Sequence, residues 1–173
     1  MAKMPNTRII LVEGDTEISI FNNLKRLGEI QAKKVVKKNL WCECIKSYSI
    51  NIPKSCDVII VFDTDVINQA DRFIKNINYL LSRKHNVILM QQTSNFEDEI
   101  AYCCSLSIRN LFSKFCKTKT PSPDDFKRDF IACTNQIEKL KNIGWDKKKW
   151  FIRQLHPSIT ILTKHQSNYD KYF

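Results

Sequence analysis

Hydrophobic and polar positions divide the first two thirds of the chain into short apolar runs and longer amphipathic stretches. Continuous apolar runs at residues 8–12, 57–62 and 87–90 are typical of strands that are buried on both faces. Residues 15–27, 66–83 and 96–111 instead place apolar side chains three and four positions apart, which predicts helices. This alternation of strands and helices predicts an α/β fold with a parallel sheet and right-handed crossovers.

The remaining third has a different pattern, because it lacks a clear buried strand. Residues 124–141 show one long helical stripe, and residues 147–154 predict a short basic helix. Residues 158–163 fit either a strand or a helical turn, and residues 40–52 could contain a strand within the poorly patterned segment 31–53. We therefore expect an α/β domain over residues 1–115 and a mainly helical, basic C-terminal extension over residues 116–173 that packs on it.

Composition excludes several classes of protein. The chain of 173 residues is 43% hydrophobic and 27% charged, which supports a packed core and argues against disorder. No run approaches the 18 or so apolar residues that a membrane span needs. The first residues lack the apolar stretch of a signal peptide, so we expect a cytoplasmic protein with no membrane partner.

Seven cysteines raise the question of disulfides or zinc. Their number is odd, no pair of Cys-x-x-Cys motifs is present, and the three histidines are scattered. A structural zinc site is therefore not expected, and reduced thiols fit a cytosolic core.

Charge is distributed unevenly along the chain. The net charge is +10, yet residues 57–100 carry four Lys or Arg and seven Asp or Glu, a balance of −3. The flanking residues 25–54 and 109–153 have balances of +6 and +7. An acidic centre between basic flanks could hold metal ions beside a polyanion, although ordinary solvated helix faces would give the same numbers.

Acidic residues end two of the predicted strands. Glu13 with Gly14 follows the first run, and Asp63-Thr64-Asp65 follows the second. Because parallel strands lie about 4.8 Å apart, carboxylates at their carboxyl ends can share a divalent cation. Hard oxygen ligands favour Mg²⁺ or Mn²⁺, and such an ion can promote phosphodiester hydrolysis.

Three short motifs in this order resemble a Toprim domain. They are Leu-Val-Glu-Gly-Asp-Thr-Glu at residues 11–17, Val-Phe-Asp-Thr-Asp at residues 61–65 and Ser-Asn-Phe-Glu at residues 94–97. The first and third are closest to the RloB-like and OLD-type Toprim nucleases, over roughly the first 115 residues. The resemblance implies a three-layer fold with a central, mostly parallel sheet of about four strands flanked by helices.

The resemblance also implies roles for individual residues. Glu13 would act as general base or metal ligand, Asp63 and Asp65 as the metal-binding pair, and Glu97 would complete the catalytic acids. The implied cofactor is Mg²⁺ or Mn²⁺. Ile67 occupies the position of a third acid in the Toprim motif, and this favours the alternative of a catalytically inactive subunit.

Two basic segments are candidates for nucleic-acid binding. One contains Lys147, Lys148, Lys149 and Arg153 around Trp150 and Phe151, and the other contains Lys33, Lys34, Lys37 and Lys38. Basic runs interleaved with aromatic residues are typical of nucleic-acid surfaces. Equally, the two aromatic residues could be core and the lysines could be solvated, with the second group on an exposed helix.

Three functions therefore remain open. The first is a metal-dependent nuclease acting on DNA or RNA, which by resemblance would serve in anti-phage defence beside an ATPase partner and could form a homo-oligomer. The second is an inactive Toprim subunit that binds nucleic acid or regulates a partner. The third is a phosphoacceptor receiver domain, which also has acids at strand ends but needs a lysine at the end of a fifth strand, and no convincing strand with such a lysine is found.

Overall fold

The computed structural model describes residues 7–173, and its centre is a four-stranded sheet. The strands are β1 (Arg8–Val12), β2 (Lys34–Lys37), β3 (Asp57–Asp63) and β4 (Asn86–Gln92). The helices are α1 (Asp15–Arg26), α2 (Lys46–Ser49), α3 (Ala70–Ser82), α4 (Phe96–Cys103), α5 (Ile108–Phe115), α6 (Pro123–Ala132), α7 (Gln136–Asn142) and α8 (Tyr169–Tyr172), with the 3-10 helices η1 (Lys147–Lys149) and η2 (Pro157–His165).

All strand pairs in this sheet are parallel, in the order β2-β1-β3-β4. Ile10 of β1 lies opposite Val35 of β2 and Ile59 of β3. The central strands are buried on both faces, which explains why they consist of continuous apolar runs rather than alternating ones. The predicted α/β fold is confirmed, and it is consistent with a Toprim-like three-layer arrangement.

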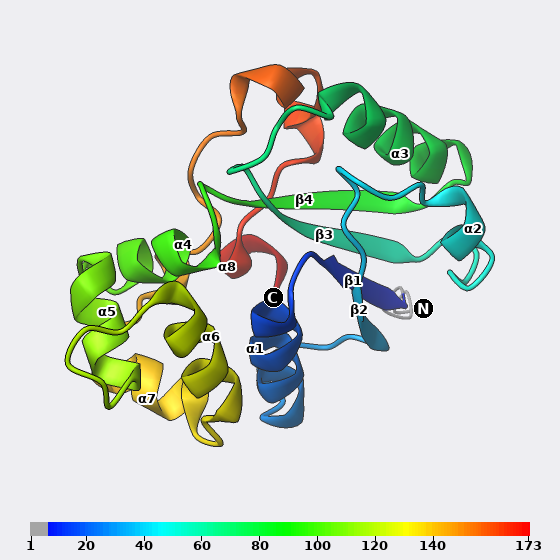
Figure 1. The fold of residues 1–173 in the computed structure, drawn as a ribbon. Helices are drawn as coiled ribbons and strands as arrows, with labels where there is room; N and C mark the ends of the chain where they lie inside the picture. The colour runs from blue at the N-terminus through cyan, green and yellow to red at the C-terminus, as the bar shows by residue number, and fades with distance from the viewer. Residues whose placement is uncertain (1–6) are drawn as a thin grey trace.

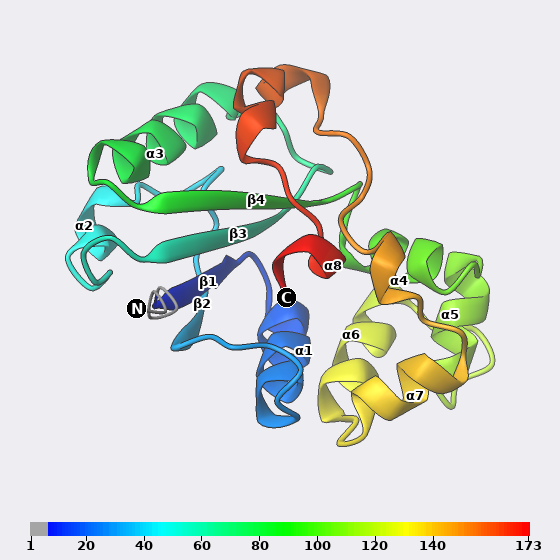
Figure 2. The ribbon, with the colours of Figure 1, turned by 180° about the vertical axis from the view of Figure 1, so that it is seen from behind.

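Helices cover both faces of the sheet (Figures 1 and 2). Ile10 and Val12 of β1 pack with α1 and α4–α7 on one face. The alternate residues Ile9 and Leu11 pack with α3 and η2 on the other face. None of the helices between residues 7 and 173 is long and apolar enough to cross a membrane.

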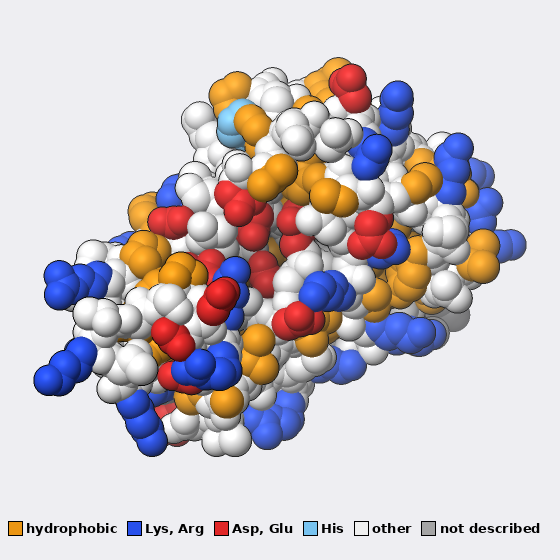
Figure 3. All heavy atoms as spheres, in the orientation of Figure 1, with side chains coloured by type: hydrophobic (Ala, Val, Ile, Leu, Met, Phe, Trp, Pro, Cys, Tyr) orange, Lys and Arg blue, Asp and Glu red, His pale blue; other side chains and the backbone are white. Residues whose placement is uncertain are grey.

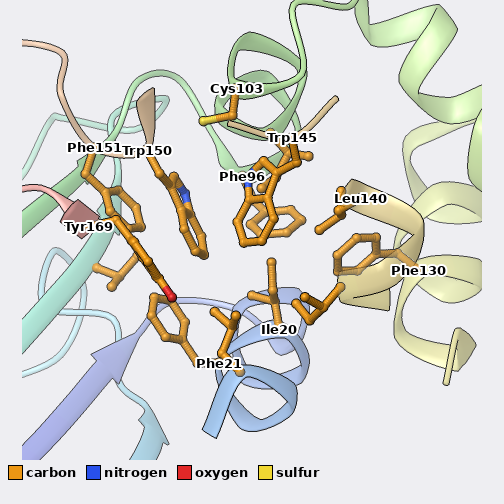
Figure 4. Packing of buried hydrophobic residues seen from close by; sticks show 14 of the residues in the cluster. Ile20, Phe21, Phe96, Cys103, Phe130, Leu140, Trp145, Trp150, Phe151 and Tyr169 are labelled. Atoms are coloured by element: carbon orange, nitrogen blue, oxygen red, sulfur yellow. The ribbon is translucent and has the colours of Figure 1, made fainter. Parts of the chain in front are cut away.

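The larger hydrophobic cluster joins the sheet to the C-terminal third of the chain. Figure 4 shows side chains from α1, α4, α6, α7 and the final segments pointing toward one another. Trp150 is fully buried, and its ring stacks on Phe21 of α1 and on Phe151, at centroid distances of 5.4 and 4.5 Å. The aromatic residues of the basic segment therefore belong to the core, which settles one of the alternatives that the sequence left open.

Two long predicted helices are each interrupted. The helix predicted over 96–111 is divided into α4 and α5, because Ser105 adopts a positive φ of 54° and Ser107 caps α5 by accepting from the backbone N–H of Asn110. The helix predicted over 124–141 is divided into α6 and α7. Gln136, at the start of α7, is buried, and its side-chain amide donates to the Phe130 carbonyl near the end of α6. In a continuous helix this carbonyl would instead accept from a backbone N–H of the following turn.

Two segments differ from their predicted structure, and in a third the structure decides between two alternatives. Residues 31–53 contain the edge strand β2 and the short helix α2, and the strand predicted within 40–52 is absent. The chain turns there instead, because the side chain of Asn39 accepts from the N–H groups of Trp41 and Cys42. The predicted helix over 147–154 shortens to η1, because Phe151 has a positive φ of 64°. Residues 158–163 belong to η2, so the helical alternative holds there rather than the strand.

The C-terminal segment is tied to the end of β4 by polar contacts. The Glu99 carboxylate is fully buried, accepts from the N–H groups of Thr93 and Phe151 and pairs with Arg153. Gln91 of β4 donates to the Gln154 carbonyl at 2.8 Å. These contacts fix the loop that follows β4, which carries part of the site described below.

We expect Arg153→Met to lower the free energy of unfolding by about 2 kcal/mol, because the buried Glu99 carboxylate would lose its cationic partner. For a chain of this length this corresponds to a melting temperature lower by roughly 4 to 8 °C. Calorimetry of the single variant and of Arg153→Met combined with Glu99→Gln tests the mechanism. The double variant should recover part of the loss, and equal loss in both would assign the effect to packing rather than to the charge.

Candidate functional site

An acidic pocket opens at the carboxyl edge of the sheet, where β1 and β3 end. Its volume is about 400 Å³, and its lining includes the acids Glu13, Glu17, Asp63, Asp65 and Glu97. Figure 3 shows Asp and Glu side chains gathered in a hollow in the middle of this face of the molecule. All four acids that the sequence nominated as catalytic therefore meet in one place, together with a fifth.

Glu13 is held in the turn between β1 and α1. Its Oε1 accepts from the backbone N–H of Asp63 at 3.3 Å, and its Oε2 accepts from Asn39 Nδ2 at 2.9 Å. Gly14 follows at the N-cap of α1, and a Cβ there would lie 2.7 Å from Glu17 Oε2, so a glycine lets the second carboxylate approach. Burial, reinforced by the charges of Glu17 and Asp65, raises the pKa of Glu13 to about 8.

Asp63 ends β3 directly beside Gln92, the last residue of β4. With the Gln92 amide oriented to satisfy its neighbours, its NH₂ donates to Asp63 Oδ1 at 2.8 Å and to Glu17 Oε1 at 3.0 Å. Burial raises the pKa of Asp63 to about 10, and the neighbouring charges of Glu17 and Glu13 add to the effect. Three acids of this pocket have a raised pKa, and Asp63 is the one whose charged form the pocket disfavours most strongly.

Glu17 is the acid whose position the sequence did not reveal. In the sequence it reads as an acid in the first turn of a helix, where negative charge is favoured, and as a better candidate than Asp15 for a supporting role at the site. In the structure it is only 2% exposed, and burial together with the charge of Glu97 raises its pKa to about 7. It therefore belongs to the acidic cluster rather than to a solvated helix end.

Two loops bring Asp65 and Glu97 to the pocket and are bonded to each other. The N–H of Thr64 donates to the Ser94 carbonyl at 2.8 Å, and the N–H of Ser94 donates to Thr64 Oγ1 at 2.9 Å. Ser94 adopts a positive φ of 65°, and Asn95 then caps α4 by accepting from the N–H of Asp98. The motifs at residues 61–65 and 94–97 are thus one structural unit.

Lys127 of α6 supplies positive charge in the pocket lining. Its Nζ lies 3.7 Å from Glu97 Oε1, a buried oxygen that makes no hydrogen bond within the described part of the chain. Half of the Lys127 side chain is exposed. A partly exposed cation over an acidic pocket is suited to contact an anionic group that approaches from solvent.

None of the eight basic residues nominated from the sequence is among the described residues that line this pocket. Lys33 and Lys34 lie at the amino end of β2, away from the acidic edge, and the group is on and beside an edge strand rather than a helix. Lys37 and Lys38 lie at the carboxyl end of β2, where they pair with Asp15 at 2.8 Å and with Glu43. The four lysines thus do not form one face.

The second basic segment is also engaged in internal contacts. Lys147 pairs with Glu29 at 2.5 Å, Lys149 donates to Ser105 Oγ at 2.9 Å, and Arg153 pairs with the buried Glu99. Lys148 is exposed, and its ammonium group has no protein partner within residues 7–173. Nucleic-acid binding by these residues therefore stays a prediction.

A divalent cation is chemically suited to this donor set. Carboxylate oxygens are the ligands that Mg²⁺ and Mn²⁺ prefer. In the described part of the chain, however, no three His, Cys, Asp or Glu side chains are arranged so that they could hold a metal ion as they stand. The amides of Asn39 and Gln92 instead donate to Glu13, Asp63 and Glu17, so a cation would require these side chains to turn.

Three polar residues of the site were missed from the sequence because they carry no charge pattern of their own. Gln92 could have been found from the register, since it ends the strand next to Asp63. Asn39 lies in a segment with poor periodicity, and Lys127 lies in the predicted extension, so no local signal connects either of them to the acids.

The interpretation of this pocket rests on the chain's own residues. Five acids from three separate segments share it, and three of them have a raised pKa. Compared with known proteins, the chain matches no family model, no curated protein and no solved structure at a significant level.

Proposed function

We propose that this protein is a metal-dependent phosphodiesterase that hydrolyses nucleic acid, either DNA or RNA. The observation that carries the proposal is the convergence of Glu13, Asp63, Asp65, Glu97 and Glu17 in one pocket at the carboxyl edge of a parallel sheet. In open α/β sheets, ligands bind at this edge. The Toprim resemblance of the sequence motifs supports the same assignment.

A structural role for these acids is disfavoured by their energetics. Burial and mutual repulsion raise the pKa of Glu13, Glu17 and Asp63, so their charged forms oppose folding at neutral pH. Strongly perturbed groups gathered in a cleft are characteristic of functional sites. A divalent cation would neutralise the repulsion that the protein alone leaves in place.

Glu13, Asp63 and Asp65 are the residues that would hold Mg²⁺ or Mn²⁺. When bound, such an ion polarises the phosphoryl group and lowers the pKa of water. Glu13 accepts from the N–H of Asp63 and from Asn39, and it is the residue that would take a proton at its carboxylate. Lys127 would contact a substrate phosphate at the mouth of the pocket.

The alternative of a catalytically inactive subunit has two observations in its favour. The acids are bonded to neutral amides, and Ile67 replaces a third acid. In that case the pocket would bind no metal. An ATPase partner and a role in anti-phage defence belong to the proposal only through the Toprim resemblance. Self-association and a cytoplasmic location stay predictions.

Metal dependence is the direct test. We expect the purified protein, alone or with its partner, to cleave nucleic acid with Mg²⁺ or Mn²⁺ and to lose this activity in EDTA. We also expect Mn²⁺ alone to raise the melting temperature, since a ligand at about 100 times its Kd adds roughly 2.7 kcal/mol to the stability of the folded state. Asp71→Asn, which changes an exposed acid on α3, is the matched control and should respond as the wild type does.

The two readouts separate the candidate functions. Cleavage at full rate in EDTA would exclude the carboxylate–metal mechanism. Absence of both cleavage and stabilisation by Mn²⁺ would favour the inactive subunit.

A further inference from the structure

A second cavity lies between α2 and α3 and has the opposite charge. Its volume is about 450 Å³, and it is lined by Cys44, Lys46, Arg72, Lys75, Asn76 and Tyr79. Three of these side chains are cationic and exposed, and no acid is among the described residues that line it. Figure 3 shows Lys and Arg side chains along the side of the molecule where α2 and α3 lie.

The walls of this basic pocket are held in place by buried hydrogen bonds. The Nδ2 of Asn76 donates to the carbonyls of Leu40 and Glu43, both at 2.8 Å, and its Oδ1 accepts from the N–H of Ile45 at 3.0 Å. One side chain on α3 thus fixes the whole segment that forms the opposite wall. The pocket is therefore largely preformed, which reduces the entropic cost of binding a ligand.

The same segment connects the basic pocket to the acidic one. Trp41 and Cys42 line the acidic pocket, and Cys44 lines the basic pocket. Trp41 stacks on Phe73 of α3 with centroids 4.4 Å apart, and its Nε1 donates to the Asp63 carbonyl at 3.0 Å. A strand of nucleic acid that leaves the acidic pocket over Cys42 would reach the basic pocket next.

The lining is suited to a nucleotide unit. Lys46, Arg72 and Lys75 can neutralise a phosphate, and Arg72 is partly oriented because it donates to the Cys42 carbonyl at 2.7 Å. The half-buried Tyr79 ring is fixed by the hydrogen bond from Ser49 Oγ to its hydroxyl at 3.3 Å, and the Lys46 ammonium lies 5.8 Å from its centroid. Aromatic rings beside cations are the usual platform for bases of a single strand.

We infer that the basic pocket between α2 and α3 binds a backbone phosphate of single-stranded nucleic acid, flanking the bond that the acidic pocket cleaves. The inference rests on the proposed function for the identity of the substrate. It assigns substrate binding to residues outside both basic segments that the sequence suggested.

Another cavity provides a matched control. It is lined by Lys54, Arg83 and Lys84, again two lysines and one arginine, all exposed. It lies beside the starts of β3 and β4, at the edge of the sheet opposite the acidic pocket. Removing these three charges changes the net charge by the same amount but leaves the proposed substrate path intact.

The experiment measures the affinity of the full chain for a fluorescein-labelled single strand in EDTA, as a function of salt. We expect the triple variant Lys46→Gln, Arg72→Gln, Lys75→Gln to raise Kd roughly tenfold and to lower the salt slope by about 0.7 for each phosphate that the variant no longer neutralises. The control triple Lys54→Gln, Arg83→Gln, Lys84→Gln should keep the wild-type slope. Because EDTA prevents metal-dependent cleavage, the result does not depend on whether the protein is a nuclease.

Two outcomes would overturn the inference. One is an equal loss of affinity in both triple variants, which would reduce the effect to net charge. The other is a first triple variant that binds the strand as tightly as the wild type does. If inorganic phosphate alone then raises the melting temperature of the wild type but not that of this variant, the pocket would be assigned to free phosphate. A protein that fails to cleave but loses strand binding only in the first triple variant would retain this pocket and lose the proposed nuclease activity.

Discussion

Replacing Glu13 by Gln should lower the rate of metal-dependent cleavage by about 10²- to 10⁴-fold, the usual contribution of a general base. The amide keeps the size of the side chain and can still accept from the N–H of Asp63, but it cannot take a proton. Asp63→Asn should cause a loss of similar size, because it removes a charged oxygen from the proposed metal site. Single-turnover rates measured beside melting temperatures of the metal-free proteins test both variants.

Stability should move in the opposite direction from activity. Asp63→Asn removes the acid whose pKa is raised to about 10, so the metal-free variant should be at least as stable as the wild type. Its carbonyl oxygen can still accept from Gln92. If instead Asp63→Asn unfolds the protein, the aspartate is a structural turn residue and the nuclease proposal loses its main support.

The stability of the metal-free protein should fall as pH rises from about 5 to about 8. Each raised pKa means that the folded state keeps a proton that the unfolded state has already released. For Asp63 this holds between its ordinary value of 3.8 and about 10, and for Glu13 between 4.5 and about 8. The folded state therefore binds more protons across this range, and the free energy of unfolding decreases with pH.

Thermal unfolding across this range in EDTA measures the effect. We expect the melting temperature of the wild type to fall by at least about 5 °C, and that of Asp63→Asn to fall less. The lowered pKa values of Glu29 and Asp125 act below this range. Burial also lowers the pKa of His85 and His165 below 6.5, so these two groups add stability as pH rises toward 6.5 and oppose part of the fall. A wild-type curve that rises from pH 5 to pH 8 would contradict the assignment of buried, mutually repelling acids.

Much of the sheet could be predicted because its strands have a local signal. The runs that became β1, β3 and β4 are buried on both faces, so nearly every residue in them is apolar. The edge strand β2 was missed because only its two valines are apolar and its flanking lysines are exposed. Helix breaks at Ser105 and near Gln136 were missed because a side chain or a positive φ interrupts an unbroken apolar stripe.

The sequence by itself determined which acids meet. In a parallel sheet the carboxyl ends of all strands lie on one edge, so Glu13, Asp63 and Asp65 had to converge once the strands were recognised. Only the tertiary structure decided that Glu17 is buried among them and that Lys127, more than 60 residues further along the chain than Asp63, lies over the pocket. Those positions follow from packing between segments that are distant in the sequence, and such packing leaves no periodic pattern there. Strand burial does leave a pattern, because a strand buried on both faces is a continuous run of apolar residues.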